Sequence, residues 1–407
     1  MQLVAYGAQD IYLTGNPQIT FFKVVYRRHT NFSMEHIQQT FKGTPGSGAR
    51  VVATVSRNGD LIHDCYIKFN CNQIGNADKE VNNPGHALIN NVEVEIGGQS
   101  IDKQYGHFME AHAELTEKNY GLVAKQGNSS VLADSYEINA TNSELSPFQQ
   151  TAGAGGVSVD QNSTGCNLYV PLRFWFCRHV GLSLPLIALQ YHEVNINVTF
   201  SDGGVYGSSS GDYKVYIGDE PQLWVNYIYL DTDERRRFAQ VSHEYLIEQV
   251  QTQDGSVAGV SKTFKLNFNH PVKELIWVGL SHDHGWGKVS FSANDFIFWG
   301  NNTTKHKLIL NGHDRFAEQD LDYFTRYQPY KYHRNLARSI RADSIAVYSF
   351  ALKPEEHQPS GTCNFSRIDS AQLEFTSGIQ TRDIFIYAIN YNVLRIMSGM
   401  GGLAYSN

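Results

Sequence analysis

The sequence is most informative in what it has little of: charge, cysteine pairs and long hydrophobic runs. Only 18% of the 407 residues are charged, below the roughly 25% typical of soluble domains, which predicts a surface that is largely neutral or covered by partners. The five cysteines show no C-x-x-C spacing, which argues against a zinc site or a disulfide framework. We expect buried free thiols in a reducing compartment.

Features of export, membrane insertion and nucleic-acid binding are also missing. The first residues carry no basic segment, and Asp10 interrupts any apolar stretch, so no secretory signal is predicted and we expect synthesis in the cytosol. Apolar runs such as residues 275–280 are far too short to span a bilayer. The net charge is −7, whereas a protein that neutralises phosphates carries a basic excess. We therefore expect no direct sequence-specific nucleic-acid binding.

The residues that are abundant favour β-structure. The chain contains 23 Tyr, 22 Phe and 35 Gly, types that suit strand surfaces and the turns between strands. Short runs with strand character, bounded by Gly, Pro, Asn or Asp, are predicted at residues 61–69, 92–96, 168–176, 186–200, 222–230, 264–268, 274–280, 307–310, 344–352, 371–375 and 384–389. One short helix is predicted over residues 108–118, where Ala and Glu dominate.

The order of these runs predicts two β-units in series. A Gly/Ser-rich break at residues 201–211 is the predicted linker. A strand running into a glycine turn occurs in both halves, at residues 94–99 and 308–313, which favours two copies of one β-sandwich. The long stretch 121–165 lacks periodicity and is predicted to be a functional or mobile loop. The predicted division is an N-terminal arm 1–19, a first unit 20–211, a second unit 212–396 and a C-terminal tail 397–407.

Motifs with chemical potential are few, and each has a more ordinary interpretation. Residues 207–211 fit the spacing G-x-S-x-G, but a nucleophile elbow requires a strand before the serine and a helix after it. His282 and His284 could begin a cupin-like metal site, yet no third ligand follows in register. Glu93 and Glu95 share one strand face and could perform acid–base work on a glycan, although a hydrated strand face is the simpler interpretation. We predict no catalytic, cofactor or metal-binding residues.

Eight N-x-S/T sequons occur in the chain. Three of them, at Asn128, Asn139 and Asn162, fall in the long aperiodic stretch and are the candidates for glycosylation.

Six blocks of the sequence are distinctive. The N-terminal block reads QLVAYGAQDIYLTGNPQITFFKVVYRRHTNF over residues 2–32. The others are SRNGDLI (56–62), LPLIALQYHEV (184–194), HEYLIEQ (243–249), QPSGTCNFSRID (358–369) and NYNVLRIMSGMGGLAY (390–405). In sequence and in order from end to end, these blocks resemble the major capsid proteins of nucleocytoplasmic large DNA viruses, especially those of phycodnaviruses.

The resemblance implies an all-β double jelly roll, two consecutive eight-stranded antiparallel sandwiches with short helices in the loops. It implies a homotrimer that forms a pseudo-hexagonal capsomer in the icosahedral shell of a large double-stranded DNA virus. The implied partners are neighbouring capsomers, minor capsid and penton proteins, and an inner membrane beneath the shell. The implied location is the virion, after synthesis in the host cytoplasm. A glycan-binding or glycan-cleaving jelly roll and a cupin-like metalloenzyme remain as alternatives.

Two segments depart from the family blocks. Residues 121–165 and 282–302 match none of them, and we predict surface loops specific to this virus there. The arm 1–19 is predicted to become ordered on contact with a neighbour or with the inner layer of the shell.

Overall fold

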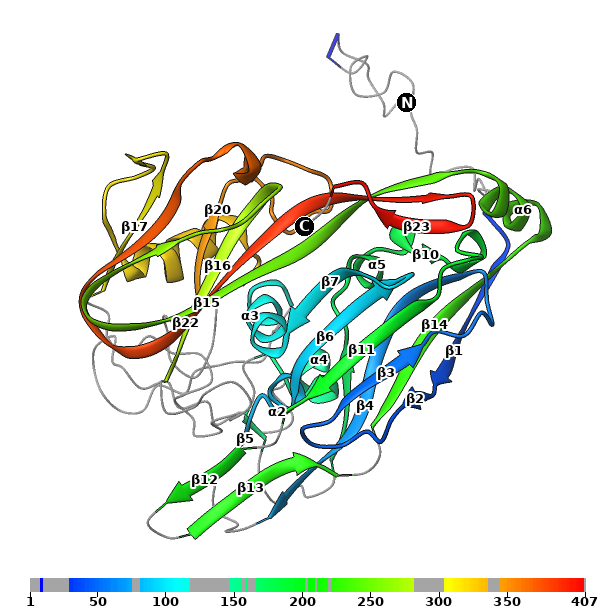
Figure 1. The fold of residues 1–407 in the computed structure, drawn as a ribbon, viewed down its shortest axis with the longest axis horizontal. Helices are drawn as coiled ribbons and strands as arrows, with labels where there is room; N and C mark the ends of the chain where they lie inside the picture. Colours follow the sequence, from blue (N-terminus) through cyan, green and yellow to red (C-terminus); the bar gives the residue numbers. More distant parts are fainter. Residues whose placement is uncertain are drawn as a thin grey trace, which may run out of the picture.

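The chain forms two β-rich units that lie side by side (Figure 1). The computed structural model describes residues 8–9, 29–74, 81–117, 146–155, 158–159, 166–201, 204–208, 211–218, 221–281, 304–335 and 345–405. The all-β prediction is confirmed, because antiparallel sheets make up the body of both units and the helices occupy the connections.

The first unit consists of two antiparallel sheets. The strands of its seven-stranded sheet are β1 (Phe32–Gln39), β14 (Gln222–Leu230), β4 (Leu61–Ile74), β13 (Gly211–Ile217) and β12 (Gly204–Ser208), with β9 (Cys166–Pro171) and β10 (Leu184–Pro185) also paired to β4. The strands of its five-stranded sheet, in spatial order, are β2 (Phe41–Lys42), β3 (Arg50–Thr54), β11 (Val194–Phe200), β6 (Ile89–Ile96) and β7 (Gln99–Tyr105). A separate small pair joins β5 (Val81–Asn82) to β8 (Ser158–Val159).

The second unit is built around two long strands. Its nine strands are β18 (His313–Asp314), β17 (Lys305–Leu310), β22 (Ala371–Met397), β16 (Pro271–Ser281), β20 (Ile345–Ser349), β15 (His243–Lys265), β19 (Gln319–Asp320), β21 (Cys363–Asn364) and β23 (Met400–Leu403). β17 pairs with residues 371–376 of β22, whereas β16 pairs with residues 382–390. The single strand β22 therefore serves two layers of the sandwich, and β15 follows it along most of its length.

Helical segments occupy the connections between strands. They are α2 (Pro84–Ala87), α3 (Gly106–Thr116), α4 (Pro147–Ala152), α5 (Trp175–Arg178), α6 (Thr232–Gln240), α7 (Gln328–Tyr332), the 3-10 turns η1 (Val180–Leu182), η2 (Leu186–Ala188) and η4 (Phe365–Arg367), and the π-helical turn η3 (Tyr323–Tyr327). The helix predicted over residues 108–118 is confirmed as α3, which begins two residues earlier.

The turn that the two halves share is also confirmed. Between β6 and β7, Gly97 and Gly98 have φ angles of 58° and 84°, and between β17 and β18, Asn311 and Gly312 have φ angles of 52° and 77°. Two consecutive residues with positive φ are the signature of a type I′ hairpin turn, for which Gly and Asn are the favoured residues. The same hairpin thus occupies the same place in both units.

Several sequence-based boundaries need correction. The predicted linker at 201–211 contains β12, which pairs with β13, and β13 in turn pairs with β4. The sheet of the first unit also includes β14, so the predicted boundary between residues 211 and 212 cuts through a sheet. In the predicted tail, β23 pairs with β22. Apart from residues 8–9, the arm 1–19 lies outside the described residues.

Two predicted strands are partly helical in the structure, and two other predicted strands belong to one continuous strand. Residues 168–176 end in helix α5, and residues 186–200 begin with the turn η2. The runs 371–375 and 384–389 belong to the single strand β22. In the first two segments, tertiary packing overrides the β-propensity of some residues. In β22, pairing with distant strands keeps the chain extended between the two predicted runs. Local sequence patterns report neither effect.

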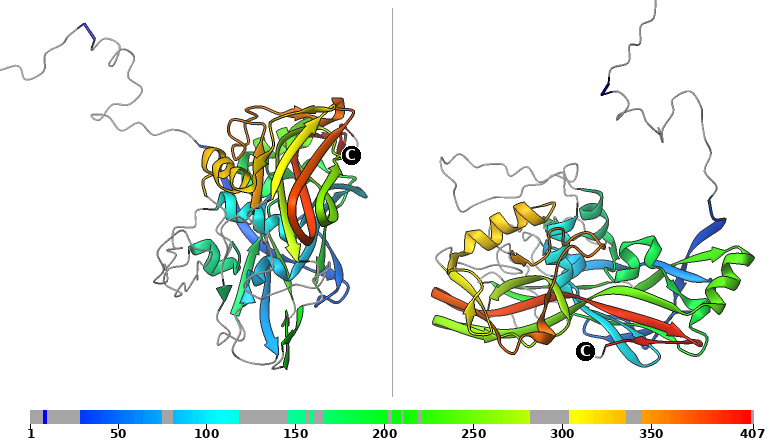
Figure 2. Two further views of the ribbon diagram at one scale, coloured as in Figure 1. Left: turned by 90° about the vertical axis from the view of Figure 1, so that its left-hand side faces the viewer. Right: turned by 90° about the horizontal axis from the view of Figure 1, so that it is seen from above.

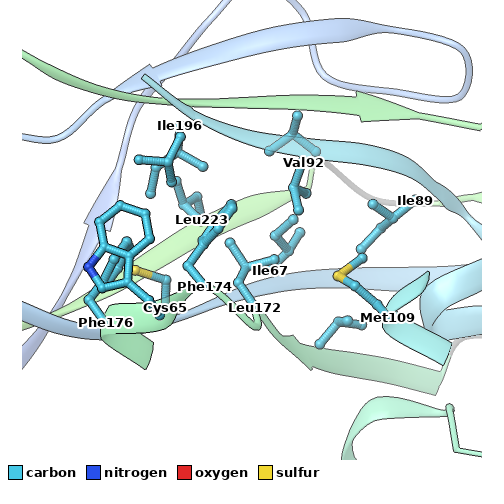
Figure 3. Close-up of a cluster of buried hydrophobic side chains, with 14 of the residues drawn as sticks. Cys65, Ile67, Ile89, Val92, Met109, Leu172, Phe174, Phe176, Ile196 and Leu223 are labelled. Atoms are coloured by element: carbon cyan, nitrogen blue, oxygen red, sulfur yellow. The ribbon is translucent and has the colours of Figure 1, made fainter. Parts of the chain in front are cut away.

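Each unit has a hydrophobic core. In the first, side chains from both sheets meet between the layers, as Figure 3 shows for Ile67 and Leu223 facing Val92 and Ile196. In the second, Trp277 and Phe324 are fully buried together with His306. The indole Nε1–H of Trp277 donates to His306 Nδ1 at 3.1 Å. His306 must therefore be neutral at that nitrogen, and burial lowers its pKa to about 3.

This buried histidine makes the second unit sensitive to acid. The folded-state pKa of His306 lies below the value in an unfolded chain, so its contribution to stability is lost as the pH falls below about 6.5. Between pH 7 and pH 5 the loss from this one group is about 2 kcal/mol.

We expect His306→Gln, which keeps an acceptor for Trp277 but does not titrate, to lose less unfolding free energy than the wild type over that interval. Urea unfolding at both pH values measures the difference. Equal losses in the two proteins would show that His306 is not the group that titrates.

Candidate assembly site

The described residues contain no recognisable reaction centre. No group of three His, Cys, Asp or Glu residues within the described ranges could hold a metal ion. His282 and His284 lie outside those ranges. The G-x-S-x-G segment falls in the β12–β13 hairpin, where a strand and not a helix follows, so the nucleophile-elbow interpretation is wrong. Among the described helices, none has the length and apolarity needed to cross a membrane.

The two strand carboxylates have structural partners. Glu93 accepts a hydrogen bond from Ser100 Oγ at 2.5 Å, and Glu95 accepts one from Asn197 Nδ2 at 3.1 Å. Each carboxylate thus links β6 to a neighbouring strand on the outward face of the sheet. The three glycosylation candidates Asn128, Asn139 and Asn162 lie outside the described residues.

The most extensive buried contact among the described residues is the junction between the two units. Helix α3 belongs to the first unit, yet every residue from Phe108 to Leu115 is buried. The Phe108 ring packs on Tyr387 of β22 with centroids 5.3 Å apart, and the His107 ring stacks on Phe385 at 5.5 Å. The outward side chains of β16 and β20, Ile276 and Val347 among them, join the same cluster as the core of the first unit. One apolar core therefore runs from the first unit to the second.

Side chains of each unit also form hydrogen bonds with the backbone of the other. The Asp102 carboxylate on β7 accepts the N–H of Val250 on β15 at 3.0 Å, and Gln249 donates to the carbonyl of Ile101. Burial raises the pKa of Asp102 to about 6, because the hydrogen bonds from Val250 and Gln104 and the field of Arg178 offset only part of the desolvation. These hydrogen bonds fix the position of β15 relative to β7, and so of the second unit relative to the first.

A buried ion cluster lies beside this contact. The Glu248 carboxylate on β15 forms ion pairs with the guanidinium of Arg178 on α5, at 2.6 Å, and with the Nζ of Lys273 on β16, at 2.8 Å. Burial alone would raise the pKa of Glu248, but Lys273, the hydrogen bond with His357 and Arg178 outweigh it and hold the pKa at about 2. Since Arg178 belongs to the first unit and Lys273 to the second, the Glu248 carboxylate connects both units.

A second cluster fixes helix α7 to the strand next to it. His333, directly after α7, has its Nε2 3.0 Å from Glu274 of β16 and its Nδ1 3.3 Å from Glu355. Burial alone would lower the pKa of His333, but the two carboxylates raise it to about 9. His333 is therefore a cation at neutral pH and binds α7 to the sheet.

The C-terminal hairpin docks back onto the first unit. The N–H of Tyr191 donates to the carbonyl of Gly399 at 2.9 Å. Gly399 has φ 81°, and a Cβ on it would lie 2.5 Å from the Tyr191 ring. A glycine is therefore required here both by the backbone conformation and by the close approach.

Exposed apolar side chains mark the surfaces left uncovered in a single chain. Phe32 and Met34 lie on β1, the edge strand of its sheet. Tyr327 and Tyr330 project from η3 and α7, and Tyr169 projects from β9. An open edge strand and exposed aromatics of this kind favour contact with another protein surface.

The comparisons with known proteins agree with this architecture. Residues 20–231 match the family model described as the major capsid protein N-terminus, and residues 234–402 match that of the large eukaryotic DNA virus major capsid protein. This chain belongs to that family.

The similarity extends over the full length. The major capsid protein of Pyramimonas orientalis virus is 50% identical, with 100% of this chain and 99% of the relative covered. That of Paramecium bursaria Chlorella virus 1 is 40% identical with the same coverage. A chain of the PBCV-1 virus capsid model has a TM-score of 0.75 at 35% identity, and covers 95% of this chain and 100% of its own. The Faustovirus major capsid protein, at 14% identity, has a TM-score of 0.67 over 96% and 94% of the two chains and shows the shared fold.

The predicted fold and function are confirmed by this family membership. The two units are the jelly rolls of a double jelly-roll capsid protein, called the first and second barrel below. The chain is a structural subunit of a virus capsid shell and not an enzyme.

The residues of the junction were missed at the sequence level. Two local patterns could have indicated them: Lys273 interrupts a largely apolar strand, and Asn392, whose Nδ2 donates to Gln249 at 2.9 Å, interrupts another. Charged or amide side chains in such runs are buried only with partners. Which partners they find depends on the other barrel, and no local pattern reports that.

We expect Glu248→Gln to destabilise the protein by about 3–5 kcal/mol, because it leaves Lys273 buried without its anion beside Arg178. Guanidinium unfolding monitored by fluorescence measures the loss. The double variant Glu248→Gln/Lys273→Met should recover part of it, since it removes the uncompensated charge as well. A single variant within 1 kcal/mol of the wild type would contradict the role of this cluster.

Proposed function

We propose that this shell subunit acts as a homotrimer that forms a pseudo-hexagonal capsomer. The observation that supports this most directly is the apolar contact between the core of the first barrel and the outward face of the second. It makes each chain a rigid pair of similar lobes, and three such pairs around an axis give six lobes. Permanent oligomers of this kind bury large apolar interfaces, which agrees with the low charge of the chain and its exposed aromatics.

We further propose that the first barrel extends through Leu230 and that the second begins at His243, with α6 as the connection. The support is that β14 pairs with β1 and β4, whereas β15 pairs with β22. The N-terminal arm precedes the exposed edge strand β1 and is proposed to order on contact with a neighbour.

A trimer has three times the mass of the 45.8 kDa chain, about 137 kDa. We expect size-exclusion chromatography with light scattering to give this mass at micromolar concentration. A monomer alone under those conditions would contradict the proposal.

The same proposal includes the contacts of the capsomer with the other components of the particle. Capsomers of this kind would contact neighbouring capsomers, minor capsid and penton proteins, and have an inner membrane beneath them, after synthesis in the host cytoplasm. No sequence-specific contact with nucleic acid is proposed, because the net charge is −7. A reconstruction of the native particle that shows the protein directly on the genome would overturn this arrangement.

We also propose that Asn128, Asn139 and Asn162 carry glycans in the virion. Peptide mass spectrometry of virion protein, before and after chemical deglycosylation, tests each site. Asn197 supplies a matched control, because it lies in a sequon but is buried on β11. Modification of Asn197, or of none of the three candidates, would contradict the proposal.

A further inference from the structure

The two barrels carry the same helix in different surroundings. In the first barrel, the β6–β7 hairpin leads directly into α3. In the second, the hairpin that starts with β17 leads through β19 into η3 and α7. In both barrels the strand before the helix lies at the edge of its sheet, beyond β6 or β17. The two helices are therefore equivalent parts of a repeated unit.

The first of these helices is covered by the second barrel. Phe108 on α3 packs on the outward face of the sheet formed by β22, β16 and β20. The centre of that face is Ile276, which stands opposite Tyr387 on one side and Val347 on the other. This face covers one side of helix α3, and α2, β6 and β7 of its own barrel contact the rest of the helix.

Among the residues that the structure describes, none covers the second helix in this way. Its inner side packs on its own barrel through Phe324, which is fully buried. Its outer side carries Tyr327 and Tyr330, which are 50% and 77% exposed, and lies on the flank of the second barrel (Figure 2). Tyrosine suits a surface that is in water before assembly and buried after it, because the ring is apolar and the hydroxyl is polar.

The first barrel carries the matching face, which is partly exposed among the described residues. The equivalent sheet has β4 at its centre between β14 and β9, and Tyr66 stands opposite Trp224 and Pro171. The Tyr66 ring stacks on Trp224 with centroids 6.3 Å apart and lies 5.8 Å from the ring of Tyr169, which is 36% exposed. We call Tyr66, Tyr169 and Trp224 the aromatic platform. Its central residue, Tyr66, lies on the middle strand of its sheet as Ile276 does in the second barrel, with Trp224 in the position of Tyr387 and Tyr169 two residues from Pro171 on β9.

We propose that the η3–α7 helix docks, through Tyr327 and Tyr330, on the aromatic platform of a second copy of this chain. The contact between chains then repeats the contact that α3 makes within the chain. Each chain supplies one helix and one platform, so the association is head-to-tail, and such contacts form a ring when the rotation closes. The inference rests on the proposed trimer and assigns the surfaces that hold it.

A cysteine pair tests the contact directly. We expect the double variant Tyr330→Cys/Tyr169→Cys to form covalent trimers on mild oxidation, seen on non-reducing gels and dispersed by a reductant. Each single variant is the control for the native cysteines and should give none. Covalent trimers in either single variant would overturn the assigned surfaces. So would the absence of covalent trimers in the double variant while light scattering still shows a trimer. Neither result would contradict the trimer itself.

A charge placed on the helix gives an independent measurement. Tyr330→Glu should weaken the trimer at least about 30-fold, as expected for an aromatic anchor at the centre of an interface. Tyr191→Glu is the matched control, since Tyr191 is 76% exposed but lies beside the C-terminal hairpin, and it should change the affinity less than about threefold. Equal effects of the two variants would refute the assignment. A wild type that is monomeric would refute the trimer and the docking surface together.

Discussion

The packing of helix α3 on the outward face of the second barrel is the contact on which the rest of the molecule depends. Two barrels joined only by the short helix α6 would be free to move relative to one another, as domains with small interfaces are. With Phe108 on Tyr387 and His107 on Phe385, the core of the first barrel extends onto the outward face of the second barrel's sheet, while the second barrel keeps its own inner core. A shell subunit needs this, because any variation in the angle between the barrels would prevent regular tiling.

The polar groups around that contact restrict the relative orientation of the two barrels. Burying Glu248 with Arg178 and Lys273 costs desolvation energy that a hydrophobic replacement would avoid. The benefit is geometric: ion pairs and the Asp102–Val250 hydrogen bond are satisfied in one arrangement only. An apolar interface alone tolerates sliding, whereas unpaired buried charges do not.

The equivalence of the barrels extends to what each leaves exposed. The second barrel covers helix α3 of the first, whereas its own helix α7 and turn η3 carry exposed tyrosines. In the proposed trimer, these tyrosines meet the aromatic platform of a neighbouring chain. The tyrosines on the open helix keep the free chain compatible with water.

The sequence by itself determined the β-rich class, the paired hairpins and the family. Alternation along β6, the residues at positions 97–98 and 311–312, and the helix at 108–118 are local features, and local sterics and burial decide them. It did not determine that the Gly/Ser-rich segment at 201–211 contributes a strand, that β22 runs unbroken through two layers, or that Glu248 joins the barrels. Those outcomes depend on pairing between residues far apart in the chain, such as Gln249 with Ile101. Only the tertiary structure decides them, because the energy of a strand edge or a buried charge is set by the partner it meets.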